Sequence, residues 1–115
     1  MSATTVSFAC ALVYHHPQLL PILEDHLEAN DGEVLPHLLL SDVIRFAAAN
    51  WSSQPAMAAS IMRWIDNAYA CGDEATQELI VVSGVEMIPD PGEAGSELRH
   101  LLGEDLRVMD PWHGS

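Results

Sequence analysis

The side chains in this chain that could do chemistry together are histidines and carboxylates. His15 and His16 are adjacent, and His26 follows later beside Asp25. Imidazole nitrogens and carboxylate oxygens are ordinary zinc ligands. A small metal-binding protein or metal-dependent enzyme that uses His15, His16 and His26 is therefore one alternative. Adjacent histidines seldom aim both rings at one ion, so surface or helix-capping roles are the favoured interpretation.

Other patterns that could carry catalysis are incomplete. Glu97 and His100 have Glu-x-x-His spacing, but di-iron bundles need two such motifs on long helices. Ser83 lies in VVSGVE, without a Gly-x-Ser-x-Gly elbow. The chain has no Gly-rich phosphate loop, no Cys-x-x-Cys pair and no lysine for a Schiff base. We therefore expect no enzyme and no cofactor.

Helices separated by turn signals must position these side chains. Leu19, Leu23 and Leu27 recur every four residues and predict an amphipathic helix with an acidic face. Asp73 is a natural N-cap for a helix over DEATQELIVVSGVEMI, although its run of Leu79 to Val82 alone also suits a strand. The sequence predicts an all-α, compact bundle of about five helices in antiparallel pairs, with a short solenoid-like arrangement as a variant. The expected helices cover about residues 17–30, 36–47, 55–71, 73–88 and 96–102.

Composition places the chain among small folded domains. The 115 residues suit one domain, residues 1–115, and 49% of them are hydrophobic, which is enough for a core. The apolar segment VSFACALVY is too short to span a bilayer and lacks basic residues before it, so we expect it inside the fold. Cys10 and Cys71 are expected to be reduced and buried, which is typical of a cytoplasmic protein.

The strongest signal in the sequence is its charge. Seventeen acidic side chains face four arginines and no lysine, giving a net charge of −13. Nucleic-acid binding needs Lys and Arg to displace counterions from phosphates, and anionic membranes repel acidic surfaces. We therefore expect no nucleic acid and no membrane as partner. A field of this sign favours a basic protein surface.

Three tryptophans and three charged residues carry further expectations. Trp64 is in register with a helix stripe and is expected in the core, whereas Trp51 is either a lid or an anchor for a partner. Trp112 is expected to clamp the C-terminal segment. Asp42 and Arg45 should pair at i, i+3, and Glu86 is either an exposed helix edge or a partner for an arginine, Arg45 or Arg63.

Two long segments carry a resemblance. GEVLPHLLLSDVIRF and GDEATQELIVVSGVEMIPDPGEAGSELRHLLG resemble a family of small acidic bacterial proteins of unknown function. The shared features are a leucine-proline-histidine step at 35–37, a Gly-Asp-Glu turn at 72–74 and Val-Ser-x-x-Glu at 82–86, where the family pattern implies a bulky aromatic at the position of Gly84. The resemblance covers about residues 16–103. Similar proteins look like immunity partners of polymorphic toxins, which implies inhibition by direct binding.

The leading hypothesis is a cytoplasmic immunity or antitoxin-like protein. It would cover a cognate toxin domain, basic around its active site, with acidic surface. An adaptor for a basic non-toxin protein is a further alternative. The oligomeric state is left open. The candidate partner-binding residues are Glu24, Asp25, Glu28, Asp31, Glu33, Trp51, Asp73, Glu74, Glu78, Asp90 and Glu93.

Overall fold

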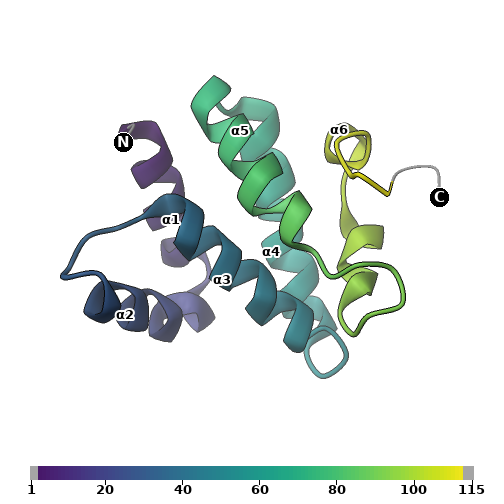
Figure 1. Cartoon of the computed structure of the whole chain (residues 1–115), viewed down its shortest axis with the longest axis horizontal. Helices are drawn as coiled ribbons and strands as arrows, with labels where there is room; N and C mark the ends of the chain where they lie inside the picture. The colour runs from purple at the N-terminus through teal and green to yellow at the C-terminus, as the bar shows by residue number, and fades with distance from the viewer. Residues whose placement is uncertain (1–2, 113–115) are drawn as a thin grey trace.

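Helical structure, α-helical or 3₁₀, lies over each of the five segments that the sequence patterns predicted, and a further helix covers residues 3–15. The computed structural model describes residues 3–112, and within them there is no strand, which confirms the all-α prediction. Five longer helices are accompanied by three 3₁₀ helices, of which two follow the fifth longer helix, and by a short sixth α-helix near the end of the described residues (Figure 1). The α-helices are α1 (Ala3–His15), α2 (Leu20–Ala29), α3 (Pro36–Ala49), α4 (Pro55–Cys71), α5 (Glu74–Ser83) and α6 (Glu104–Arg107). The 3₁₀ helices are η1 (Pro17–Leu19), η2 (Val85–Met87) and η3 (Ser96–Leu101).

Prolines and one aspartate set the helix starts. Pro36 and Pro55 occupy the first turns of α3 and α4, where their missing N–H groups cost no helical hydrogen bond. Asp73 caps α5, because its Oδ1 accepts the backbone N–H of Thr76 at 2.9 Å. The other oxygen, Oδ2, accepts the hydroxyl of Thr4 at 2.6 Å. A single carboxylate therefore starts α5 and ties it to α1.

The end of α5 differs from the prediction. The expected helix to residue 88 ends at Ser83 and continues as the 3₁₀ turn η2. Gly84 is buried, and a Cβ there would lie 2.3 Å from the carbonyl oxygen of Ile80. The bulky aromatic that the resemblance implied at this position does not fit this backbone. The last expected helix, over residues 96–102, is also 3₁₀ in geometry.

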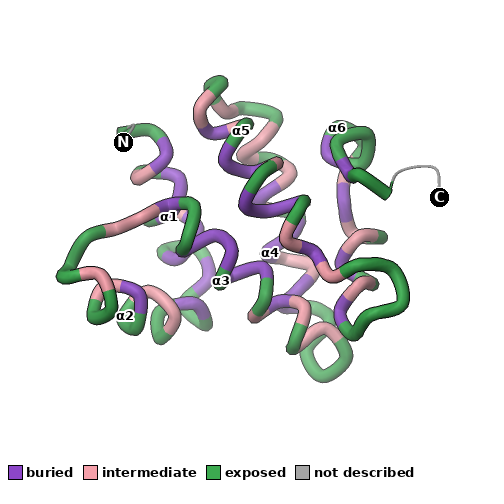
Figure 2. Tube along the Cα trace, viewed as in Figure 1, coloured by how far each residue is buried: buried purple, intermediate pink, exposed green. Residues whose placement is uncertain are grey.

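The core lies where α1, α3, α4, α5 and η3 meet. Leu12, Ile44, Ile61, Leu79 and Leu98 come one from each element and are fully buried. Figure 2 shows buried positions running along α3 and α5, with the loops exposed. The apolar segment at the N-terminus is part of the fold, as expected, because α1 buries one side of it. The run from Leu79 to Val82 is helical, with only its inner residues buried.

The helices form one body with α2 at its edge. In Figure 1, α3 and α5 lie side by side, α4 runs against them behind, and α2 lies beside the start of α3. The radius of gyration of 13.3 Å is close to the value of about 13 Å expected for a compact domain of this size. No described helix is long and apolar enough alone to cross a bilayer; Ala3–His15 and Pro17–Ala29 pass only together, bent by 110°.

The loop before η3 docks tightly onto α3. Gly95 has a φ of +90°, which favours glycine, and a Cβ there would lie 2.6 Å from the Cβ of Ala48. Arg99 of η3 forms an ion pair with the buried Asp110 and donates to the carbonyl oxygen of Pro89 at 2.7 Å. The Gly95 contact places this loop against α3, and the Arg99 contacts join η3 to the segments before and after it.

The expectation that both cysteines are buried was wrong. Cys10 and Cys71 are both exposed, because each lies on the outer side of its helix. Glu86 is exposed and forms no ion pair within residues 3–112, which leaves the interpretation as a helix edge.

Other expectations about single side chains hold. Arg45 pairs with Asp42 at 2.7 Å, as the i, i+3 spacing predicted. Trp64 packs against the core at its edge, with its ring 5.6 Å from that of Phe8. Trp51 is partly buried against the core, which favours a lid. The exception is Trp112, which is 42% exposed and does not form the expected clamp.

Candidate functional site

The three histidines of the metal alternative each have contacts within the fold. His16 is buried, with Nδ1 3.0 Å from the carbonyl oxygen of Leu12 and Nε2 3.3 Å from the hydroxyl of Ser60. His15 packs its ring against Trp64, 5.7 Å between centroids. Among residues 3–112 no group of three His, Cys, Asp or Glu side chains could hold a metal ion. The described residues do not supply the ligand set that this alternative requires.

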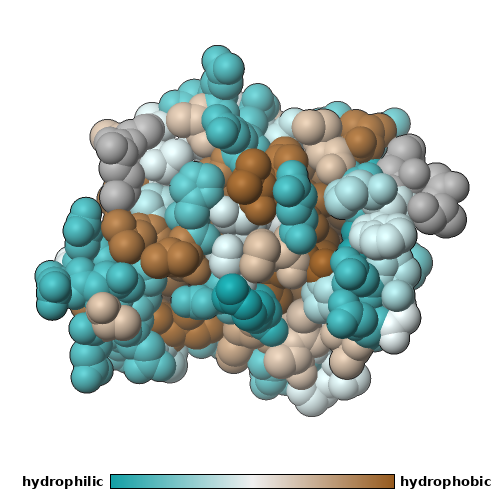
Figure 3. Space-filling model, viewed as in Figure 1, coloured by the Kyte–Doolittle hydropathy of each residue, from teal (hydrophilic) through white to brown (hydrophobic). Residues whose placement is uncertain are grey.

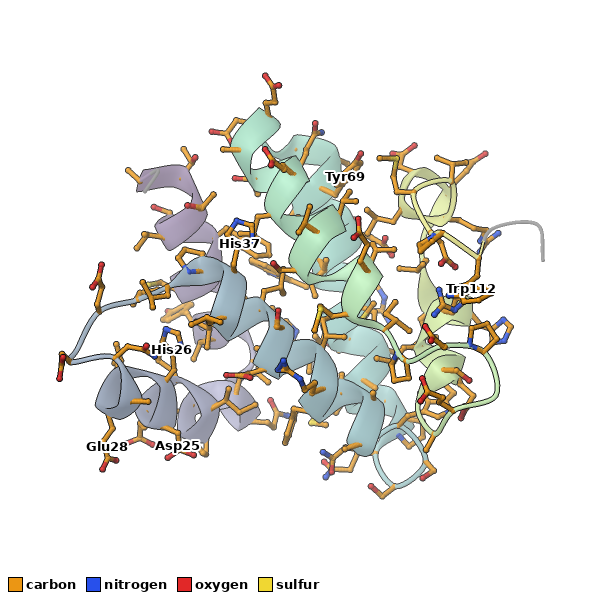
Figure 4. The ribbon with its side chains drawn as sticks, viewed as in Figure 1. Asp25, His26, Glu28, His37, Tyr69 and Trp112 are labelled. Carbon is orange, nitrogen blue, oxygen red and sulfur yellow. The ribbon has the colours of Figure 1, made fainter. Side chains whose placement is uncertain are left out.

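His26 has a structural position that the sequence did not indicate. It is buried, and its Nε2 accepts the backbone N–H of Leu35 at 2.9 Å. Figure 4 shows its ring pointing from α2 toward the segment that leads into α3. The Asn30 side chain also donates to the carbonyl oxygen of His26 at 2.8 Å. His26 therefore fixes the turn between α2 and α3.

Two of the three motifs behind the resemblance meet in space. The ring Nδ1 of His37, at the start of α3, lies 2.6 Å from the hydroxyl of Ser83, at the end of α5. The Ser41 hydroxyl donates to the carbonyl oxygen of His37 at 2.8 Å. The partner of the His37 ring is thus a side chain on another helix. The pair therefore joins α3 to α5.

A serine held by a histidine invites comparison with a catalytic pair. A serine nucleophile in such a pair needs hydrogen-bond donors directed at the oxyanion that forms when the serine attacks a substrate. Ser83 is buried at the C-terminal end of α5, where the unpaired backbone groups are carbonyls, which repel an oxyanion. We therefore assign the His37–Ser83 contact a structural role.

The acidic surface is largely uncompensated. All but two of the seventeen acidic residues are exposed; Asp66 is partly buried and Asp110 is buried. Burial raises the pKa of the Asp66 carboxyl, although its oxygens accept the N–H of Gly103. Within residues 3–112 the Lys/Arg ion pairs are Arg45 with Asp42 and Arg99 with Asp110. Most of the negative charge therefore faces solvent without a partner.

The predicted partner-binding acids are exposed, but they do not form one patch. They fall into three groups on different edges of the molecule, and α2 lies at the opposite end from the loop around residues 90–93 (Figure 1). The groups are Glu24, Asp25, Glu28, Asp31 and Glu33 on α2 and its following turn, Asp73, Glu74 and Glu78 at the start of α5, and Asp90 and Glu93 in the loop before η3.

Two of these acids are already used within the fold. The hydroxyl of Thr4 and the N–H of Thr76 lower the pKa of Asp73. Glu93 turns back on its own loop, where its Oε1 accepts the N–H of Asp90 at 2.9 Å. Trp51 lines a separate hollow beside Ala48 and Gly95. The α2 group is therefore the largest set of predicted acids that lies together.

A groove beside the α2 acids adds apolar surface that the predicted interface lacked. It lies between α2 and α3 and has a volume of about 450 Å³. Figure 3 shows apolar surface between hydrophilic patches over this part of the molecule. The residues that line the groove are Ile22, Asp25, His26, Ala29, Asn30, Leu38, Asp42 and Phe46.

Sequence reasoning missed Leu38, which is 53% exposed in this groove. The signal was the run of three leucines at 38–40, because one helix cannot turn three successive side chains into the same core.

Fold and surface define the class: an all-α domain with an acidic surface and an apolar groove between two helices. Residues 10–109 match the domain of unknown function DUF7674, and the chain belongs to this family. No curated protein and no solved structure matches the chain significantly. The likeness to immunity proteins therefore has no named relative in support.

Proposed function

We propose that this chain is an immunity-type protein that binds a basic toxin domain and neutralises it through its acidic surface. The observation that carries the proposal is the exposed, uncompensated charge on a rigid helical scaffold. A field of this strength speeds association with a basic partner and disfavours acidic competitors. Affinity then comes from a few desolvated contacts.

Charge alone does not distinguish a toxin from another basic protein. The discriminating experiment mixes the purified chain with the product of the gene next to its own. We expect the two proteins to form a complex in size-exclusion chromatography. We also expect that expression of this chain rescues cells in which the neighbouring gene product, expressed alone, is toxic. No association together with no toxicity of the neighbour contradicts the proposal. Association without toxicity supports the adaptor alternative instead.

The electrostatic part of the proposal has its own measurement. Association rates between complementary charged surfaces fall steeply with ionic strength, because the Debye length shrinks from about 30 Å at 0.01 M to about 3 Å at 1 M salt. We expect the association rate to fall over this range while the dissociation rate changes less. A salt-independent association rate would show that the acidic surface does not guide binding.

A further inference from the structure

We infer that the groove between α2 and α3 is the docking site for an amphipathic helix of the partner, one that carries arginine or lysine beside its apolar side chains. The inference rests on the proposed function, because it assigns the binding surface and the segment that this surface recognises.

The groove has the geometry of a helix-binding site. Ile22, Asp25 and Ala29 follow one another at i, i+3 and i+7 on α2, with His26 and Asn30 beside them. The facing residues of α3 are spaced by one helical turn each. Two such helix stripes bordering a hollow of about 450 Å³ offer ridges and a groove into which a third helix can pack.

The floor of the groove is apolar and partly open to water. Leu38 is 53% exposed, while Ile22 and Phe46 are partly buried against the core. Covering these side chains with apolar groups of a partner removes apolar surface from water, which favours binding. A large exposed leucine beside a hollow marks the point where an apolar anchor fits.

The charge around the groove selects a basic occupant. Asp25 and Asp42 line it, and no lysine or arginine precedes Arg45 in the sequence. Asp42 pairs with Arg45, but both side chains are about half exposed, and such surface pairs contribute little stability. A basic side chain of a partner can therefore compete for Asp42. A second copy of the chain would bring the same charge of −13 to the interface.

One contact already joins the two sides of the groove in the unbound chain. His26 Nε2 accepts the backbone N–H of Leu35, which ties the turn before α3 to α2. Contacts that form before binding reduce the ordering that binding must supply.

A second hollow, of about 340 Å³, lies beside α5 and provides a matched control. Glu74, Glu78, Val82 and Met109 line it, so it also combines carboxylates with exposed apolar side chains. The double variant Glu74→Gln/Val82→Ala removes one charge and truncates one apolar side chain there. The double variant Asp25→Asn/Leu38→Ala makes the equivalent change in the α2–α3 groove. All four side chains are exposed, so both variants should fold.

The probe is a synthetic helical peptide with leucines at i, i+3 and i+7 of one face and arginines beside them. A second peptide replaces each arginine by glutamate. We expect amide shifts of the isotope-labelled full chain to gather on α2 and the first turns of α3 with the basic peptide only. The groove variant should bind roughly tenfold more weakly, as loss of an anchor residue predicts, whereas the α5 variant should bind within about twofold of wild type.

Three results would overturn the inference: no binding of the basic peptide, shifts centred on another surface, or equal weakening by both variants, which would indicate unspecific charge attraction. These failures are separable from failure of the proposed function. If the chain neutralises its neighbour's product and the groove variant still does so fully, the groove is wrong and the function stands. If the peptide occupies the groove but the neighbour is neither toxic nor bound, the groove is a binding site and the proposed function is wrong.

Discussion

Asp73 shows how much one side chain does in a domain of this size. Its two oxygens accept the N–H of Thr76 at the start of α5 and the hydroxyl of Thr4 on α1. The sequence indicated the first contact, because an aspartate before a helical pattern is an N-cap. It gave no indication of the second, because Thr4 lies far from Asp73 along the chain. The same carboxylate therefore combines a local and a long-range contact.

We expect Asp73→Ala to lower the Tm at neutral pH, and the loss to be pH-dependent. Donation from Thr4, and then from Thr76, lowers the pKa of Asp73 below its ordinary value of 3.8. A lowered pKa means that the carboxylate stabilises the folded chain above pH 3.8, and that this contribution is lost as the pH falls through the folded value. The difference in Tm between variant and wild type should therefore shrink below pH 3.8.

Thermal melts at a series of pH values measure this effect. Glu78→Ala, an exposed acid later in the same helix, serves as the control. A constant difference between Asp73→Ala and wild type across the acid range would contradict the role of the ionised carboxylate.

At the scale of elements, the pairing of α3 with α5 brings two separate sequence motifs into contact. The leucine-proline-histidine step starts α3, and the Val-Ser pair ends α5. Pro36 starts α3 and so places His37 in its first turn. The contact between His37 and Ser83 then joins this turn to the end of α5. Both motifs are therefore parts of one packing contact.

A double-mutant cycle on His37→Ala and Ser83→Ala tests this contact. We expect a coupling of about 0.5–1.5 kcal/mol in the free energy of unfolding, because a net hydrogen bond in a protein contributes about that much. Urea denaturation of the four proteins supplies the values. The exposed Asp42–Arg45 pair is the comparison; its coupling should be smaller and should fade in salt. A coupling near zero for His37 and Ser83 would mean that the two helices pack without this bond.

At the scale of the whole molecule, the fold tolerates strong self-repulsion. A compact domain with a charge of −13 keeps most of its carboxylates at the surface, and its core of aliphatic side chains offsets the repulsion. In α2, Glu24 and Glu28 are exposed at i, i+4, a spacing at which like charges destabilise a helix. Such an arrangement is expected where the charge serves a partner and not the fold.

We therefore expect sodium chloride to raise the Tm, because added ions screen the repulsion among surface carboxylates. Calorimetric scans from low to high salt measure the rise. The variant Glu24→Gln/Glu28→Gln should melt higher than wild type at low salt and should gain less from added salt. A Tm that is flat or falls with salt would show that self-repulsion is not a significant cost in this fold.

The sequence by itself determined the starts of α3, α4 and α5, the all-α class and the sign of the surface charge. These follow from local rules: proline at a first turn, aspartate as an N-cap, leucines at helical spacing, and a count of charges. Only the tertiary structure decided the roles of His26 and His37, the exposure of Cys10 and Cys71, and the groove beside Leu38. Those depend on which helix faces which, and contacts between residues far apart in the chain leave no mark in local spacing.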